Sequence, residues 1–359
     1  MSTKLAPLSL AATLLAGTAM ADVPSVAVDI APVHSLVARV MAGVGEPNLI
    51  LPAGASPHEY SLRPSDASAL QEADIVVWMG SDLTPWMEDA IATLATDAQV
   101  TTLLEAEETT LLDFREGALF ETHDHDDDDH DDHDDHGGDH DDHGAEEAAA
   151  DGHHDDDHGH AEDAKADDHD DHGHEDHADA EQGHDDHDHG DHDPHAWLAP
   201  SNASAWLNLI AAKLSAADPD NAGAYFANAA AGQAELERLA EDVRTLLAPV
   251  ESGSFIVFHD AYQYFETDFD VTAAGAISLG DAAEPSPARI TEIQARVQET
   301  GVTCILSEPQ YNANLVSTVL DGTEAGTGVI DPLGVTMELG PELYPQLIRN
   351  MATTLANCG

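Results

Sequence analysis

The sequence predicts an α/β protein with two lobes, each containing a parallel sheet, joined by one long rigid helix. Short apolar strand patterns alternate with helical patterns on both sides of a central polar stretch, and such alternation is typical of parallel α/β sheets. From Asn221 to Leu247, apolar residues recur at helical spacing over a length of about 40 Å. A helix of this length is suited to act as a strut between the lobes.

The chain divides into four expected parts. These are a signal peptide at 1–21, an N-terminal lobe at 22–220 that contains a disordered His/Asp-rich loop at 121–193, a linker helix at 221–248 and a C-terminal lobe at 254–359.

The N-terminus has the pattern of a secretory signal. Lys4 is its only base, residues 5–16 form a short apolar run, and Ala19, Met20 and Ala21 have the small-x-small form of a cleavage site. We expect a soluble, exported protein, with cleavage after about Ala21. The alternative is an apolar first helix of the fold. No other apolar run approaches the roughly 20 residues that span a bilayer.

Apolar and β-branched runs predict the strands, and apolar residues at helical spacing, with proline at several first helical positions, predict the helices. In the first lobe the predicted elements are strand 23–30, helix 32–42, strand 49–51, helix 65–72, strand 75–78, helix 85–94 and strand 100–104. After the polar stretch they are helix 201–215, the long helix, strand 255–258, helix 262–265, strand 271–277, helix 287–300, strand 302–306, helix 314–320, strand 328–330 and helix 341–356.

The polar stretch from Glu121 to Asp193 holds 19 of the 23 histidines and about half of the 71 acidic residues, with Lys165 as its only base. No apolar residue larger than alanine occurs in it, so it cannot offset its ordering entropy by burial. Neutral imidazole binds zinc, copper and nickel, which predicts metal binding, whereas a plain acidic tail would not require so many histidines. The auxiliary weak sites are assigned to His123, His125, His130, His133, His184, His187, His189 and His192.

Charge and cysteine content narrow the partners and the compartment. The formal net charge is -60, and the part of the chain outside the tract is also acidic, which disfavours nucleic acid and anionic membranes as partners. Cys304 and Cys358 are the two cysteines. In an oxidising compartment they can pair, and two free thiols are the alternative.

Three candidate metal ligands come just after strand patterns: His58, His259 and Asp331. Ligands of α/β sheets bind outside the carboxyl ends of the strands, so these residues are expected to meet in a cleft between the lobes. His195 lies where the tract rejoins the folded chain. Three histidines and one carboxylate match a tetrahedral zinc site, although the spacing alone is a weak signal. His34 is expected to begin a helix or to contact a metal ligand, rather than to bind the metal itself.

The chain resembles the periplasmic metal-binding proteins of ABC transporters and, within them, the ZnuA-type zinc-uptake proteins. The resemblance covers the chain outside the signal and the tract, and it depends on six segments. These are Gly54 to Asp66, Asp193 to Leu198, Phe258 to Tyr262, Glu284 to Pro287, Ser307 to Gln310 and Asp331 to Gly334.

The resemblance implies two lobes joined by a rigid helix, with Zn²⁺ in the cleft and a His-rich loop between the first two ligands. It places His58, His195 and His259 as zinc ligands, and Asp331 at the position of a carboxylate ligand in manganese members. Those members usually have glutamate at the position of His259. Some zinc members have glutamate before the first histidine, where this chain has Pro57, so the fourth ligand stays open between Asp331 and a water. The resemblance also implies a disulfide between Cys304 and Cys358.

The predicted function is a monomeric zinc receptor that passes its ion to a membrane ABC permease and is not an enzyme. A zinc hydrolase is one alternative, but no motif such as His-Glu-x-x-His supplies a base beside a ligand. A zinc buffer acting through the tract is another, and a manganese-binding relative is a third. Zinc stoichiometry with and without residues 123–192 separates a receptor from a buffer.

Overall fold

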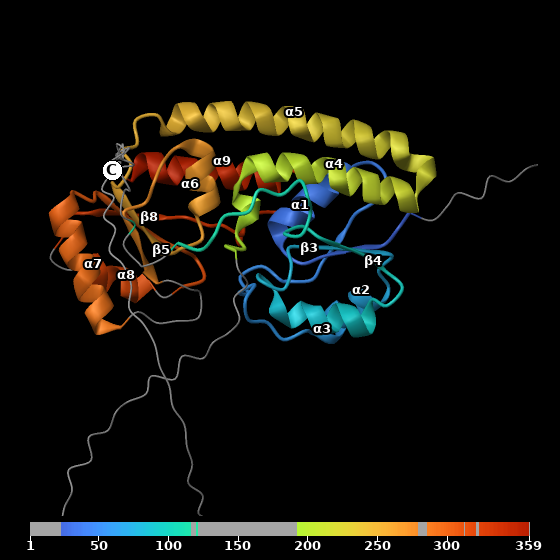
Figure 1. Ribbon diagram of the computed structural model, residues 1–359, viewed down its shortest axis with the longest axis horizontal. Coiled ribbons are helices and arrows are strands. Elements are labelled where there is room, and N and C mark those ends of the chain that lie inside the picture. Colours follow the sequence, from blue (N-terminus) through green and yellow to red (C-terminus); the bar gives the residue numbers. More distant parts are fainter. Residues whose placement is uncertain are drawn as a thin grey trace, which may run out of the picture. The chain divides into compact units, whose positions relative to one another are not determined.

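The computed structural model describes residues 23–115, 120, 192–278, 286–311, 313–320 and 323–358 (Figure 1). The predicted signal peptide and nearly all of the His/Asp-rich loop lie outside these ranges. Among the described residues, no helix combines the length and the apolar character needed to cross a membrane.

The first sheet is entirely parallel and has the order β2-β1-β3-β4. Its strands are β1 (Val26–Val28), β2 (Asn48–Leu49), β3 (Ile75–Trp78) and β4 (Gln99–Thr102), and its helices are α1 (Ala31–Val40), α2 (Pro64–Gln71) and α3 (Pro85–Leu94). Each of these helices has proline in its first turn, where the missing N–H is not needed by the helix.

The second sheet repeats this arrangement as β6-β5-β7-β8, again entirely parallel. Its strands are β5 (Phe255–His259), β6 (Gly275–Ser278), β7 (Cys304–Ser307) and β8 (Gly326–Val329), and its helices are α6 (Gln263–Phe269), α7 (Pro287–Thr300), α8 (Ala313–Leu320) and α9 (Leu343–Asn357). The two parallel α/β lobes predicted from the sequence are therefore confirmed.

Among the described residues between the two sheets there are two helices and two short 3₁₀ turns: η1 (Ala196–Leu198), α4 (Pro200–Ala217), η2 (Pro219–Asn221) and α5 (Ala222–Leu247). The predicted long helix is α5, and it packs along α4, α1 and α9, as Figure 1 shows. Since α1 belongs to the first sheet and α9 follows the second, α5 contacts elements of both lobes. The limits proposed for the four parts of the chain stay predictions.

Each sheet buries both faces, because successive strand side chains point to opposite sides. On one side, Val26 and Val28 of the first sheet and Val257 of the second belong to a single apolar cluster that includes α1, α4, α5 and α9. On the opposite side, the first sheet packs on α2 and α3, and the second packs on α7 and α8. One continuous core therefore joins the two lobes.

Several predicted boundaries were wrong by a few residues, mainly around α6. This helix continues to Phe269 instead of ending at 265, because Asp270 takes a left-handed conformation (φ 56°) and caps it. The following strand begins at Gly275 rather than at 271, since only Gly275 to Ser278 pair with β5. β1 and β2 are also shorter than their predicted strands, whereas β8 begins at Gly326, two residues before the predicted start, and ends at Val329 instead of 330.

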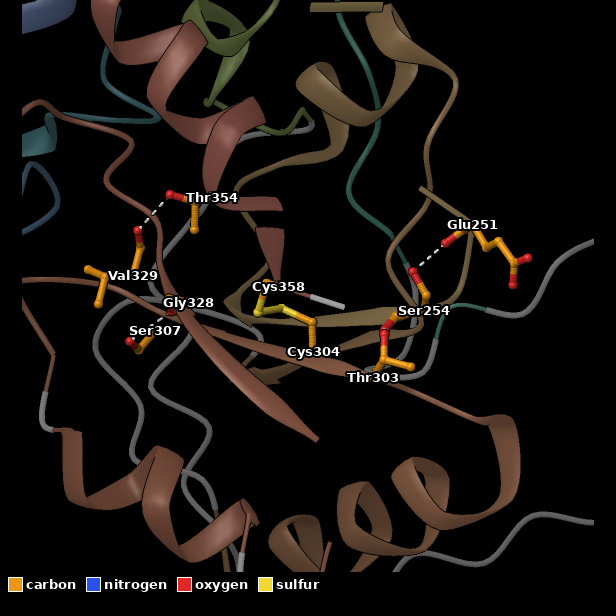
Figure 2. Close-up of a disulfide and its surroundings, with 9 residues drawn as sticks. All are labelled: Glu251, Ser254, Thr303, Cys304, Ser307, Gly328, Val329, Thr354 and Cys358. Atoms are coloured by element: carbon orange, nitrogen blue, oxygen red, sulfur yellow. Dashed lines mark hydrogen bonds between the residues drawn. A yellow bond between two sulfur atoms is a disulfide. The ribbon is translucent and has the colours of Figure 1, made fainter. Parts of the chain in front are cut away.

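A disulfide joins Cys304 at the start of β7 to Cys358 at the end of α9, which confirms the predicted pair (Figure 2). The bridge closes a sequence separation of 54 residues, which corresponds to about 4 kcal/mol in the chain-entropy model. Gly328 is required beside it, because a Cβ there would lie 2.8 Å from Thr354 and 3.3 Å from the Cys358 sulfur. The bridge thus fastens the C-terminus to the second sheet.

A buried carboxylate connects two strands of the first sheet. Asp29, at the end of β1, is 0% exposed and accepts hydrogen bonds from the backbone N–H groups of Ile30 (2.8 Å) and Met79 (2.7 Å). Burial raises the pKa of Asp29 from 3.8 to about 7, against the smaller opposite effect of these hydrogen bonds.

Since the native state holds this proton more tightly than the unfolded chain, Asp29 contributes stability that is fully present below about pH 4 and is lost as pH rises through about 7. We predict that Asp29→Asn removes this contribution to the pH dependence of the free energy of unfolding. The limiting slope of the contribution is about 1.4 kcal/mol per pH unit. Urea unfolding of the metal-free protein between pH 4 and 8 measures it. Asp74→Asn is the control, because exposed Asp74 also accepts a backbone hydrogen bond, from Ser25. Parallel curves for wild type and Asp29→Asn would contradict the assignment.

Candidate metal centre

Three histidine rings that are far apart in the sequence lie beside one another. His58 is in the loop after β2, His195 immediately precedes η1, and His259 is the last residue of β5. The ring centroid of His195 lies 5.7 Å from that of His58 and 5.3 Å from that of His259. We call these three residues the histidine cluster. It combines side chains from both lobes and from the segment between them.

The His259 ring is held by a buried glutamate. Its Nδ1 lies 2.6 Å from Oε1 of Glu308, and the two side chains are 4% and 0% exposed. β5 and β7 are neighbours, so His259 and Glu308 meet at the carboxyl end of the sheet where the strand order reverses. A carboxylate only accepts hydrogen bonds, so Nδ1 carries the proton and the lone pair remains on Nε2.

A buried aspartate holds the His195 ring in the same way. Oδ1 of Asp193 lies 2.7 Å from Nδ1 of His195 and also accepts the backbone N–H of His195 at 3.0 Å. Asp193 is 1% exposed. Carboxylate–histidine pairs of this kind fix the tautomer and the orientation of metal-binding imidazoles and increase their basicity. Two of the three rings are therefore prepared to present Nε2 to a cation.

Aromatic side chains surround the cluster. The Trp197 ring lies 5.3 Å from that of His195, and the rings of Tyr311 and Tyr262 lie 5.6 and 6.1 Å from that of His259. Burial raises the pKa of Tyr262 well above its usual value, and the nearby charges of Glu308 and Asp331 add to this effect. These rings make an apolar wall, in which electrostatic interactions are stronger than in water.

The spacing of the rings agrees with a shared ion. Two imidazoles on one tetrahedral zinc, with Zn–N near 2.1 Å, have centroids about 5 Å apart, close to the observed spacing. Within the part of the chain that the structure describes, however, no group of three or more His, Cys, Asp or Glu side chains is already arranged to hold a metal ion.

Asp331 has a local structural role. Its Oδ1 accepts the N–H groups of Leu333 (3.1 Å) and Gly334 (2.8 Å), and its Oδ2 accepts that of Val335 (2.7 Å). Three backbone donors hold this carboxylate in the turn after β8. Oδ1 already accepts two hydrogen bonds, so only Oδ2 retains a lone pair for a further ligand, and any movement toward the cluster would break these bonds.

Of the other candidate histidines, the structure describes His34 and His192. His34 is buried on α1, with Nε2 3.1 Å from the carbonyl oxygen of Pro47, so it stabilises the turn after α1. His192 has its Nδ1 3.0 Å from Oδ1 of Asp113, and these two residues form an antiparallel bridge. The remaining auxiliary histidines (His123, His125, His130, His133, His184, His187 and His189) lie outside the described residues.

Comparison with known proteins identifies the family. The family model described as "Zinc-uptake complex component A periplasmic" (ZnuA) matches residues 26–358. The chain belongs to the ZnuA family. It is similar to the high-affinity zinc uptake system protein ZnuA of Brucella abortus (strain 2308), at 42% identity over 93% of this chain and 91% of that protein. The corresponding protein of Paracoccus denitrificans is 40% identical over 98% of both chains.

A solved structure shares the fold. A crystal structure of ZnuA superposes with a TM-score of 0.66 over 94% of this chain and 99% of that one, at 19% sequence identity. Two parallel-sheet lobes with a connecting helix are thus the architecture of ZnuA proteins. Sequence analysis did not assign roles to Asp193 and Glu308, although both lie in segments that carried the family resemblance.

We predict that Glu308→Gln weakens metal binding by about tenfold, because the amide preserves the shape but removes the charge that polarises His259; outer-shell substitutions typically cost about 10- to 100-fold. Competition titration of Zn²⁺ against a chelator measures it. Glu292→Gln is the matched control, since Glu292 is a half-exposed glutamate on α7. Equal affinities for the Glu308→Gln variant and the wild type would contradict the orienting role.

Proposed function

We propose that this protein captures Zn²⁺ in the periplasm and delivers it to an ABC permease for import. The observation that carries the proposal is the histidine cluster, in which buried carboxylates orient two of the three imidazoles. Family membership supports the same function, since the 40–42% identical relatives are named high-affinity zinc uptake proteins.

The donor set favours zinc over manganese. Three neutral imidazoles suit zinc, whereas manganese prefers oxygen ligands. His58, His195 and His259 are the proposed ligands, and either Asp331 or a water completes the site. The three backbone hydrogen bonds to Asp331 favour the water, because they hold the carboxylate in its own turn.

Export and a permease partner agree with the periplasmic description of the family. Residues 1–21 are proposed as the signal peptide, cleaved after about Ala21. The Cys304–Cys358 disulfide is consistent with an oxidising compartment. We further propose that the receptor acts as a monomer and catalyses no reaction.

The His/Asp-rich tract is proposed to collect ions for the cluster. Its histidines lie among many acids, whose negative field concentrates cations and speeds encounter. The tract contains no apolar residue larger than alanine, so its sites are proposed to be weaker than the cluster, whose rings are held by buried carboxylates. Because the tract is tethered to the same chain, its ions are at a high effective concentration for the cluster.

We predict that His58→Ala, His195→Ala and His259→Ala each weaken the tight zinc site by more than the roughly 100-fold upper cost of an outer-shell change, because each removes a nitrogen ligand. Asp331→Ala should cost less, since water can replace it. His34→Ala is the control, being a buried histidine away from the cluster. Isothermal titration with chelator competition measures the affinities. A variant that retains tight binding would remove that histidine from the ligand set.

We predict that deleting residues 123–187 removes several weak zinc sites, leaves the tight site nearly unchanged and slows loading at low zinc and low salt. This deletion retains His192 and its contact with Asp113. Equilibrium titration and stopped-flow loading compare it with the full chain.

A second variant distinguishes the effect of the acidic charges of the tract from that of its imidazole groups. Replacing the tract histidines by asparagine should abolish the weak sites but retain the acceleration at low salt, because the acids remain. Loss of most tight binding on deletion would favour a zinc buffer over a receptor. Equal loading rates for all three proteins would exclude a capture role.

A further inference from the structure

The segment Thr109–Arg115, here called the strap, leaves the first sheet after β4 and is fastened to three other parts of the fold. Thr109 Oγ1 accepts the indole N–H of Trp206 on α4 at 2.8 Å. The backbone of Thr110 exchanges two hydrogen bonds with the Asn202 side chain, at 2.9 and 3.1 Å. The strap is thus fixed along α4 before it reaches α6.

On α6, the strap and the residues before His195 share one tyrosine. The hydroxyl of Tyr264 accepts the N–H of Leu112 at 2.9 Å and donates to the carbonyl oxygen of Asp193 at 2.7 Å. The N–H of Asp193 in turn donates to the carbonyl oxygen of Leu112 at 2.9 Å. Asp193, the carboxylate that orients His195, is therefore held by the strap and by α6 together.

The strap ends in a buried charge cluster beside His259. Arg115 Nε lies 3.0 Å from Oδ1 of Asp260, and its Nη1 lies 2.6 Å from Oε2 of Glu266 on α6. The side chains of Arg115, Asp260 and Glu266 are 14%, 9% and 5% exposed. Phe120 covers the guanidinium, with the Cζ atom 3.6 Å from its ring centroid.

These contacts form an unbroken connection between two proposed ligands. Arg115 holds Asp260, the residue directly after His259, and it fixes the strap that holds Asp193, the residue that orients His195. A planar guanidinium can donate to two carboxylates in fixed directions, whereas an ammonium group acts as a point charge. The two rings therefore share a support that depends on the shape of one side chain.

We propose that Arg115 is a positioning residue of the metal site, which sets the His195 and His259 rings relative to each other by clamping the strap to Asp260 and Glu266. This inference rests on the proposed function of the histidine cluster. Arg115 touches neither ring and acts only through Asp193 and Asp260.

The test compares Arg115→Met with Arg115→Lys by two measurements. The first is zinc affinity, at a temperature where each metal-free protein is folded. The second is the visible spectrum of the Co²⁺-loaded proteins. Arg115→Met is expected to lose about 10- to 100-fold in affinity, as outer-shell changes do. Its cobalt spectrum should change, because the imidazoles are reoriented. Arg115→Lys should retain part of the lost zinc affinity and part of the wild-type cobalt spectrum. Arg349→Met, which removes an arginine from an exposed pair with Asp242, is the matched control and should match wild type.

A second variant applies if Arg115→Met fails to fold. Tyr264→Phe keeps the buried ring but removes the hydroxyl between Leu112 and Asp193, and it should weaken zinc binding by up to about tenfold with an altered cobalt spectrum. The decisive variant is the one that folds. If it has a lower melting temperature but the zinc affinity and cobalt spectrum of the wild type, the positioning role is overturned. His259→Ala is measured in parallel. If it also binds zinc normally, the proposed function has failed rather than the role of Arg115.

Discussion

The continuous apolar core between the two sheets is the constraint on which the histidine cluster depends. Parallel sheets must be covered on both faces, and here α1, α4, α5 and α9 cover the inner faces of both sheets at once. The lobes therefore share a packed interior instead of meeting across a polar interface. Because such interiors are close-packed, a side chain at the end of β5 and another in the loop after β2 are held at a defined separation.

Within this frame, buried carboxylates hold two rings of the cluster. Ionised groups are costly to bury without partners, yet Asp193 and Glu308 are almost fully enclosed. Each has an imidazole N–H as its partner, so the arrangement that satisfies the carboxylate also fixes the histidine tautomer. A cation placed among the Nε2 atoms would add positive charge near these carboxylates. The chemistry of the cluster thus follows from the requirements of burial.

Sequence analysis could predict much of the fold because periodicity is a local signal. The alternation of strands and helices and the long helix α5 follow from residue spacing, whereas the end of α6 at Phe269 depends on the left-handed Asp270, which no periodicity indicates. The site is different, because His58, His195 and His259 come from three separate segments. Their spacing alone was a weak signal, and the family resemblance was needed to group them.

The residues that hold the histidine rings could not be predicted from the sequence for a related reason. Asp193 and Glu308 lie 2 and 49 residues from the histidines they orient, and Arg115 lies 145 and 151 residues from Asp260 and Glu266. An isolated arginine before an acidic tract carries no local pattern that would identify its partners. Such roles become visible only when the sheet order and the path of the strap are known.

The base of the strap also explains how a long insertion can enter the chain so close to a proposed ligand. The Asp113–His192 bridge and the Leu112–Asp193 hydrogen bond join the two ends of the insertion within the folded part of the chain. Once the ends are joined, each doubling of the loop between them costs only about 0.6 kcal/mol of closure entropy. The number of histidines in the tract can therefore vary at little cost to the fold. The orientation of His195 depends instead on Asp193, Tyr264 and Leu112, which lie outside the loop that the bridge closes.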